Sequence, residues 1–268
     1  MKNQKSSRAP KILAACVLLL FLGVAGAAFL WHTLVNLDYF RIREIAASEP
    51  NIIDLSFLKG RNIFSVDLDS QAQRLTESYP IYKKIRLIRV LPDRLFVDFI
   101  KRKPVAYIKL YKYFSVDEDG VLFEIPGGIQ PQELPILLGL ETKILGPKAG
   151  KKFNVKELQL ALQMIRQVRS DRMLKYWRMT RVSMSNPQEA SIFMALPVKR
   201  PGIFLNAASA SPEPDPIEVK LGDEDTAGKI RILTSLLIHL KNDWVNIKYI
   251  DLRFNEPAVK FKEKDAKK

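Results

Sequence analysis

An uncharged apolar run near the N-terminus constrains this chain more than any other feature of its sequence. The run extends from Ile12 to Trp31, and its 20 residues include no charged side chain. An α-helix rises about 1.5 Å per residue, so the segment is about 30 Å long, the thickness of a bilayer's hydrocarbon core. No second long apolar run follows. We therefore expect one transmembrane helix, over residues 12–34.

The flanking charges predict how this helix is oriented. Four basic residues and no acidic one precede the run: Lys2, Lys5, Arg8 and Lys11. Positively charged flanks stay in the cytoplasm, which predicts a cytoplasmic tail over residues 1–11 and an extracytoplasmic remainder. A cleaved signal peptide is the alternative, because Ala25-Gly26-Ala27 offers small residues for cleavage. The apolar run is longer than the roughly 7–15 residues of a secretory signal, which favours an uncleaved anchor.

Few residues in this chain can support catalysis or hold a metal. Cys16 is the single cysteine, which excludes an internal disulfide and a Cys-rich metal site. Of the two histidines, His32 and His239, the second follows Ser235 by four residues, but no nucleophile-elbow glycine pattern surrounds that serine. The acidic cluster at 117–120 lacks the spacing of a calcium loop and predicts a hairpin turn. We expect no catalytic residue, no metal site, no cofactor and no enzymatic activity.

The first extracytoplasmic part, residues 38–105, shows the pattern of a small sheet covered by helices. Apolar alternation indicates strands, and apolar residues three or four apart indicate helices. Pro92-Asp93 between the last two strands is a turn signal. The predicted order is β-α-α-β-β, with a strand over 39–45, helices over 51–58 and 67–79, and strands over 85–90 and 95–100.

The second part, residues 106–262, changes to short strands with two amphipathic helices, over 155–168 and 226–241. The predicted strands cover 106–110, 113–116, 121–125, 182–184, 192–196, 202–205, 217–221, 247–254 and 258–262. A stretch rich in Ala, Ser and Pro over 206–216 predicts a mobile loop, and residues 263–268 form a charged tail. The fold class is α+β: a transmembrane helix, a small β-α-α-β-β domain, and a mostly antiparallel β domain with two or more flanking helices.

Positive charge is concentrated in one segment. The chain has 43 Lys and Arg against 29 Asp and Glu, and residues 81–112 hold ten basic and two acidic residues. Nucleic acid is not an expected partner outside the membrane. Anionic lipid headgroups, anionic wall polymers and an acidic protein face remain open, as does a plain solvated strand face.

Several short motifs, in order along the chain, are similar to those of one protein family. They are Phe40-Arg41-Ile42, residues 60–68 (GRNIFSVDL), residues 89–95 (RVLPDRL), residues 101–106 (KRKPVA), residues 116–123 (VDEDGVLF), Leu134-Pro135, residues 219–222 (VKLG), residues 249–254 (YIDLRF) and Pro257-Ala258-Val259. Each motif is modest alone, but their order and spacing together resemble the FtsQ/DivIB family of bacterial cell-division proteins. Members carry one membrane anchor, a POTRA domain and a β domain.

This resemblance implies a non-enzymatic scaffold in the inner membrane at the division septum. It would bind FtsB and FtsL and link them to the septal peptidoglycan synthase during septum assembly. In the family the last strands of the β domain bind FtsB, and an open sheet edge is suited to such strand addition. Carried over, the edge is Lys248–Phe254 with Ala258–Phe261 beside it. The expected partner-binding residues are Tyr249, Asp251, Arg253, Phe254, Ala258 and Val259.

Two assignments from the resemblance have alternatives. Arg253 would pair either with a carboxylate of the partner or with a nearby acid of this chain, such as Asp251 or Glu256. The POTRA domain is associated with recruitment to the division site, and the candidate patch for it is Lys83, Lys84, Arg86 and Arg89. Competing functions for the whole chain are an export or envelope-assembly protein with a POTRA domain, an envelope-polymer-binding protein, and a membrane-anchored envelope enzyme.

Overall fold

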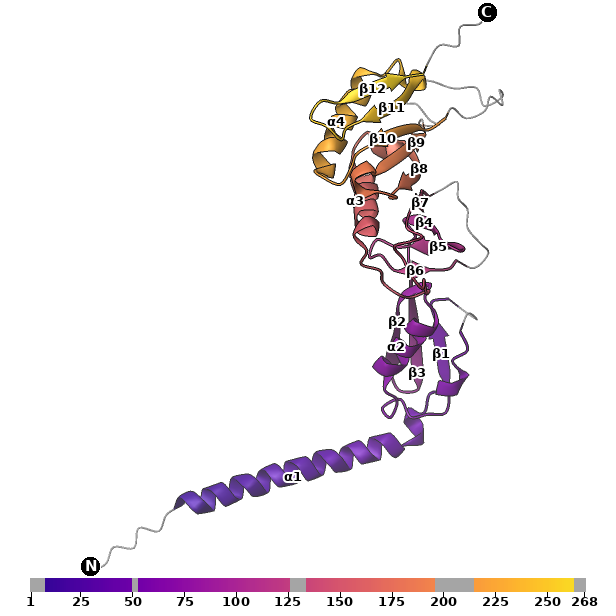
Figure 1. Cartoon of the computed structure of the whole chain (residues 1–268). Coiled ribbons are helices and arrows are strands. Elements are labelled where there is room, and N and C mark those ends of the chain that lie inside the picture. Colours follow the sequence, from indigo (N-terminus) through magenta and orange to yellow (C-terminus); the bar gives the residue numbers. More distant parts are fainter. Residues whose placement is uncertain (1–7, 50–52, 126–133, 196–214, 263–268) are drawn as a thin grey trace, which may run out of the picture. The chain divides into compact units, whose positions relative to one another are not determined.

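The computed structural model describes residues 8–49, 53–125, 134–195 and 215–262 (Figure 1). The chain divides into two compact units, Met1–Lys101 and Arg102–Lys268, and each has a hydrophobic core of its own. Most of the predicted cytoplasmic tail, the predicted strand over 202–205, nearly all of the predicted loop over 206–216 and the charged tail over 263–268 lie outside the described residues.

The first unit begins with α1 (Arg8–Asn36), one uninterrupted helix (Figure 1). Its segment Cys16–Asn36 is long and apolar enough to cross a membrane, and it is the one such helix among the described residues. None of that segment is buried against the rest of the chain. A core helix of a water-soluble domain would bury an apolar face, so the lack of any buried residue in this apolar segment favours the membrane as its environment.

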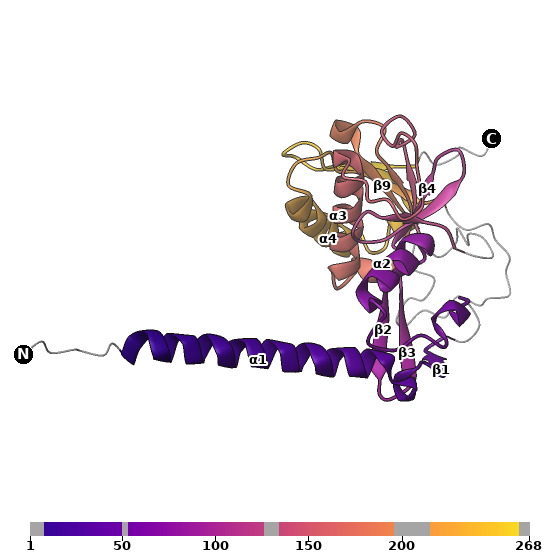
Figure 2. The same ribbon diagram turned by 90° about the horizontal axis from the view of Figure 1, so that it is seen from below.

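A three-stranded sheet, the small sheet, follows the helix. Its strands are β1 (Glu44–Ala47), β2 (Tyr82–Val90) and β3 (Arg94–Lys101), in the order β1-β3-β2. β1 runs parallel to β3, and β2 runs antiparallel to it. Helix α2 (Leu68–Ser78) packs on β2 (Figures 1 and 2). Asp67 starts this helix, because its carboxylate accepts a hydrogen bond from the backbone N–H of Ser70 at 3.2 Å.

Two predicted elements of this unit differ in the structure. The helix expected over 51–58 is a single 3₁₀ turn, η2 (Ser56–Leu58), within the described part of that range. Asp54 opens the turn by accepting the N–H of Ser56. The strand expected over 39–45 is displaced to β1, because residues 40–42 instead pair their backbone with residues 60–63, and Asp38–Phe40 forms the 3₁₀ turn η1.

Asn62, in the connection between η2 and α2, ties the end of α1 to the rest of the first unit. Its amide nitrogen donates to the carbonyl of Leu34 at 2.9 Å and to that of Leu37 at 3.3 Å. Its side-chain oxygen accepts the N–H of Phe64, whose ring meets that of Trp31 edge-on at 6.4 Å between centroids. The last carbonyls of a helix have no partner within the helix. This explains why an asparagine stands in the motif over 60–68.

The second unit is built on a nine-stranded sheet, the large sheet, in the order β12-β11-β10-β9-β8-β7-β4-β5-β6. Its strands are β4 (Ala106–Lys109), β5 (Tyr113–Val116), β6 (Leu122–Phe123), β7 (Ile136–Leu138), β8 (Arg178–Ser183), β9 (Ser191–Ala195), β10 (Ile217–Lys220), β11 (Ile247–Asp251) and β12 (Ala258–Phe261). Three short 3₁₀ turns, η3 (Leu174–Tyr176), η4 (Pro187–Glu189) and η5 (Trp244–Asn246), connect elements. Most neighbouring strands are antiparallel, as predicted, but β4–β7, β7–β8 and β10–β11 are parallel.

Two helices cover one face of the large sheet (Figures 1 and 2). They are α3 (Lys156–Ser170) and α4 (Thr226–His239). Their buried side chains, including Leu162, Ile165 and Leu233, belong to one cluster with Ile192 and Val219 of the sheet. The 3–4 spacing of apolar residues along both helices predicted these buried faces.

Strand ends in the large sheet differ from the predicted ones for local reasons. β6 has two residues in place of the predicted 121–125. β8 starts at Arg178, four residues earlier than predicted. β11 ends at Asp251 in place of Phe254, because the Asp251 carboxylate accepts the backbone N–H of Arg253 and so turns the chain.

A candidate partner-binding edge

The strand β12 forms one end of the large sheet. It pairs with β11 in an antiparallel register that sets Asp251 opposite Ala258 and Ile250 opposite Val259. No described strand pairs with its outer side. The opposite end of the sheet differs, because the backbone of Leu122 in β6 exchanges hydrogen bonds with Lys151 and Gly150. Among the described residues, β12 is therefore the open edge of this sheet.

Alternation along β12 identifies the peptide groups on its outer side. The N–H of Lys262, just after the strand, donates to the carbonyl of Asn246 on the β11 side at 2.7 Å. Along an antiparallel strand, successive residues direct their N–H and C=O to opposite sides. Lys260 and Ala258 therefore face β11, and Phe261 and Val259 present their N–H and C=O outward. These four groups are the ones a further strand would bond.

The side chains at this edge combine apolar surface and charge. Val259 packs partly buried against the core, while Phe261, opposite Ile247 in the register, is 44% exposed. On the other face of the sheet, the ring of Tyr249 lies under the ammonium of Lys220, 5.0 Å from it. Exposed aromatic side chains beside an unpaired strand edge are typical of a surface that another chain covers.

The structure places Asp251 and Arg253 in one ion pair. Arg253 Nη2 lies 2.7 Å from Asp251 Oδ2, and Arg253 Nε lies 3.0 Å from Asp251 Oδ1. The hydrogen bonds from Arg253 hold the pKa of the Asp251 carboxyl below its usual range, and the same pair raises the pKa of Arg253. Of the two partners considered for Arg253, the intramolecular one is present in this structure. Phe254 follows in the β11–β12 connection and is 68% exposed.

We expect the Asp251–Arg253 pair to stabilise the fold fully above pH about 4 and progressively less below it. The folded pKa of Asp251 is below the unfolded value of about 3.9, so the contribution is complete above that value and is lost as pH falls through the folded pKa. At pH 7, Asp251→Asn should lower the free energy of unfolding by about 1.5 kcal/mol. Denaturant unfolding of both proteins between pH 2 and pH 7 checks this. A difference that stayed constant across the acid range would contradict the assignment.

The expected partner-binding residues lie partly on the inner strand β11 and partly on the edge strand β12. Tyr249 and Asp251 lie on β11, which is an inner strand bonded on both sides, so its main chain is closed to strand addition. Of the edge expected at 248–254 with 258–261 beside it, the second strand, β12, is the open one, and it carries Ala258 and Val259. Sequence reasoning did not single out Phe261. The signal was present, because Val259 and Phe261 alternate with Ala258 and Lys260 at the end of a strand pattern.

The basic patch predicted for recruitment lies on β2, an edge strand of the small sheet. Arg86 pairs with Asp98, with Nε 3.0 Å from Oδ2. Arg89 donates to the backbone carbonyls of Ile63 and Val66 at 2.9 Å each, so its guanidinium supports the fold. Lys84 is exposed. It lines, with Arg86, a groove of about 460 Å³ between α2 and β2. A recruitment role for Lys83, Lys84, Arg86 and Arg89 remains a prediction.

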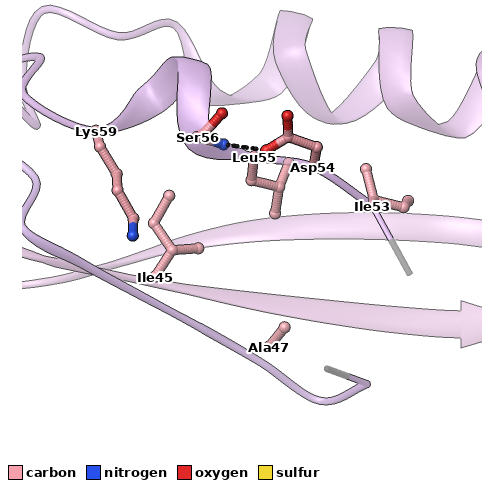
Figure 3. A pocket seen from close by; sticks show the side chains of 7 residues that line it. All are labelled: Ile45, Ala47, Ile53, Asp54, Leu55, Ser56 and Lys59. Atoms are coloured by element: carbon pink, nitrogen blue, oxygen red, sulfur yellow. Dashed lines mark hydrogen bonds between the residues drawn. The ribbon is translucent and has the colours of Figure 1, made fainter. Parts of the chain in front are cut away.

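A second groove in the first unit, of about 450 Å³, lies beside β1 (Figure 3). Apolar side chains of Ile45 and Leu55 face it, and its polar groups come from Asp54, Ser56 and Lys59. The N–H of Ser56 donates to the Asp54 carboxylate at 2.9 Å and lowers the pKa of that exposed carboxyl. The described residues of this lining offer neither a nucleophile–base pair nor a set of metal ligands.

The described residues also show no other catalytic arrangement. His239 Nδ1 contacts the backbone carbonyl of Ser235 at 2.8 Å, while the Ser235 hydroxyl donates to the carbonyl of Arg231. The imidazole therefore does not act on the hydroxyl in this geometry. No group of three or more His, Cys, Asp or Glu side chains is placed to hold a metal ion in the part of the chain that the structure describes.

An apolar helix long enough to cross a membrane, a small mixed sheet and a large sheet with an open edge strand define a single-helix membrane protein with an α+β body. Residues 106–253 match the model of the FtsQ/DivIB C-terminal domain of cell division proteins. The chain belongs to the FtsQ/DivIB family of cell division proteins.

Curated relatives agree with this family. The cell division protein FtsQ of Geotalea daltonii is 23% identical over 257 residues, which cover 93% of this chain and 85% of that protein. FtsQ of Anaeromyxobacter sp. is 30% identical over 152 residues, covering 53% of this chain and 49% of that protein. DivIB of Clostridium acetobutylicum is 32% identical over 117 residues, covering 41% and 47%. The similarity thus includes both FtsQ and DivIB proteins.

Proposed function

We propose that this protein is a non-enzymatic scaffold of the bacterial divisome. It binds FtsB and FtsL homologues outside the cytoplasmic membrane and links them to the septal peptidoglycan synthase and other divisome proteins. The observation that carries the proposal is the open edge of β12, which pairs with β11, the last strand within the residues 106–253 that match the family. The N-terminal tail lies in the cytoplasm, as its basic residues predict, and the domains over 38–105 and 106–262 are extracytoplasmic.

The mechanism of binding is strand addition at β12. An incoming extended segment of the FtsB homologue bonds the outward N–H and C=O groups of Val259 and Phe261. The exposed ring of Phe261 then loses its contact with water, and apolar burial adds affinity at about 25 cal/mol per Å². Phe254 and Tyr249 contribute aromatic surface nearby. Specificity comes from side chains, because backbone bonding alone accepts any sequence.

Proline substitution at β12 tests this mechanism. Phe261→Pro removes an outward N–H but no bond to β11, so the edge strand should persist while partner binding falls. We expect affinity for the extracytoplasmic segment of the FtsB homologue to drop at least tenfold, measured by fluorescence anisotropy with the full chain in nanodiscs. Phe261→Ala separates the loss of the ring from the loss of the N–H.

Two controls keep this test decisive. Lys260→Ala changes an exposed side chain of the same strand and should leave binding within about twofold of the original value. Circular dichroism of each variant shows whether the sheet is intact. Unchanged affinity in a folded Phe261→Pro protein would exclude β12 as the contact.

Localisation tests the wider role. A fluorescent tag on the cytoplasmic N-terminus should give a band at the constriction of dividing cells, lost when division is blocked upstream. Uniform envelope signal through the cell cycle would instead favour an export or envelope-assembly protein, or one that binds an envelope polymer.

A further inference from the structure

Cationic side chains recur at every third residue across the end of α3, the turn η3 and the start of β8. They are Arg166, Arg169, Arg172, Lys175 and Arg178, and we call the surface around them the arginine face. Four of them line its two pockets, and Arg172 is exposed between the lining residues Ser170 and Leu174 of the chain. Residues 166–178 include one acid, Asp171. Its carboxylate already accepts hydrogen bonds from two backbone N–H groups and from the Thr234 hydroxyl. Its single negative charge offsets only one of the five cations, so the surface stays positive.

The exposed cations of the arginine face have few partners of opposite charge. Arg166, Arg172 and Lys175 form no ion pair with any other described residue. Arg169 donates to the carbonyl of Val105 at 2.9 Å, and burial lowers the pKa of its guanidinium. A guanidinium that meets a carbonyl in place of a carboxylate keeps its positive charge and further N–H groups for an added anion.

Two adjoining pockets lie in the arginine face, and they share Ile165 and Arg169. The smaller one, about 180 Å³, is lined by apolar side chains, including Leu174 and Trp177, with Lys175 and Arg178 beside them. The larger one, about 300 Å³, is lined by Val105 and Leu162 together with Arg166. Among the described residues of the two linings, Glu118 is the single acidic one. Each pocket is therefore lined by both apolar side chains and cationic side chains.

We propose that the arginine face docks an acidic segment of another protein that places one apolar side chain in each pocket and carboxylates on Arg166, Arg172 and Lys175. The cations require a negatively charged ligand, and the apolar pocket walls require one that also carries apolar side chains, as a protein segment does. An anionic wall polymer offers charges but no apolar side chains. A membrane surface offers a plane of headgroups that does not fill two separate pockets. Arginine pairs well with carboxylates because two of its N–H groups reach both oxygens.

This site is distinct from the edge proposed above. β8 is separated from β12 in the large sheet by β9, β10 and β11, so a strand on β12 and a segment on the arginine face do not compete for the same backbone. The proposal does not depend on strand addition, and each stands or falls by its own variants. A scaffold with two separate binding surfaces can hold two partners at once, and the arginine face would serve as the second of these surfaces.

Selection from a displayed library of random 16-residue peptides tests the proposal. The bait is the full chain in nanodiscs of zwitterionic lipid. The counter-selection protein is R172E/K175E. We expect enriched peptides to combine Asp and Glu with Leu, Ile or Phe at a recurring spacing. Enriched peptides without acidic residues, peptides with acids but no recurring apolar residue, or no enrichment over the counter-selection would each overturn the proposal.

A matched charge reversal completes the test. K152E/K156E changes the net charge equally at two exposed lysines elsewhere in the same unit. An enriched peptide should lose at least tenfold in affinity with R172E/K175E and less than twofold with K152E/K156E, by fluorescence anisotropy. Equal losses would mean that the peptide senses only net charge. A second copy of this chain is the remaining candidate for the arginine face, and sedimentation velocity of the unmodified protein tests it. Self-association that R172E/K175E abolishes would show a second copy on this face and contradict the proposal.

Discussion

Replacing Gly139 with alanine is expected to lower the free energy of unfolding of the second unit by about 4 kcal/mol or more. Gly139 follows β7 with φ +83°, a conformation that costs an L-residue about 1–2 kcal/mol. A Cβ at this position would also lie 2.6 Å from the Cα of Ser185 and closer still to its amide nitrogen. The backbone N–H of Met184 donates to the carbonyl of Leu138 at 2.9 Å. Because this bond holds the two segments together, neither can move away.

A matched glycine separates the two costs. Gly146 also has a positive φ, +59°, but nothing lies within 4 Å of the position its Cβ would take. Gly146→Ala should therefore lose only the conformational part, about 1–2 kcal/mol. Denaturant unfolding followed by the fluorescence of Trp177 and Trp244, whose rings lie 5.0 Å apart in this unit, measures both variants. Similar losses in the two variants would show that the segment after β8 yields to the added methyl group.

The sequence predicted this fold best where apolar residues kept one regular spacing over a long segment. The apolar spacing along α3 and α4, and the uncharged run of α1, leave little choice, because each places one continuous surface in a single environment. The parallel pairing of β4 with β7 and of β7 with β8 was not predictable from strand patterns. β7 is three residues long, too short to show a clear apolar alternation. Its place in the sheet depends on packing of Leu137 in the same hydrophobic cluster as the buried side chains of α3.

The candidate site was predictable in location but not in detail. The order of short motifs pointed to the last strands, yet only the topology shows that β11 is enclosed and β12 is open. Arg253 illustrates the difference. From the sequence, a partner's carboxylate and a nearby acid such as Asp251 or Glu256 were equal choices. The outcome depends on β11 ending at Asp251, where the turn brings the Arg253 guanidinium back onto that carboxylate. Such local geometry leaves no periodic signal.

Replacing Asp117 with alanine is expected to cost about 3–5 kcal/mol, the range for breaking a buried ion pair by removing one partner. The side chains of Asp117 and Arg102 are 4% and 11% exposed, and Arg102 Nη1 lies 2.6 Å from Asp117 Oδ2. The other carboxylate oxygen accepts the N–H groups of Asp119 and Val121 at 3.0 and 2.9 Å. Asp117 thus closes the turn between β5 and β6 and holds the first residue of the second unit against it.

The charge and the turn contribute separately to this cost, and two further variants divide them. Asp117→Asn keeps one side-chain oxygen for the backbone N–H groups but removes the negative charge, so it should lose less than Asp117→Ala. A double-mutant cycle of Asp117→Asn with Arg102→Met then isolates the ion pair, and a coupling above about 1 kcal/mol distinguishes a buried pair from an exposed one. A smaller coupling, with Asp117→Ala still strongly destabilising, would assign the role of Asp117 to the turn alone. The acidic cluster at 117–120 would then be a structural element whose charge serves only to accept hydrogen bonds.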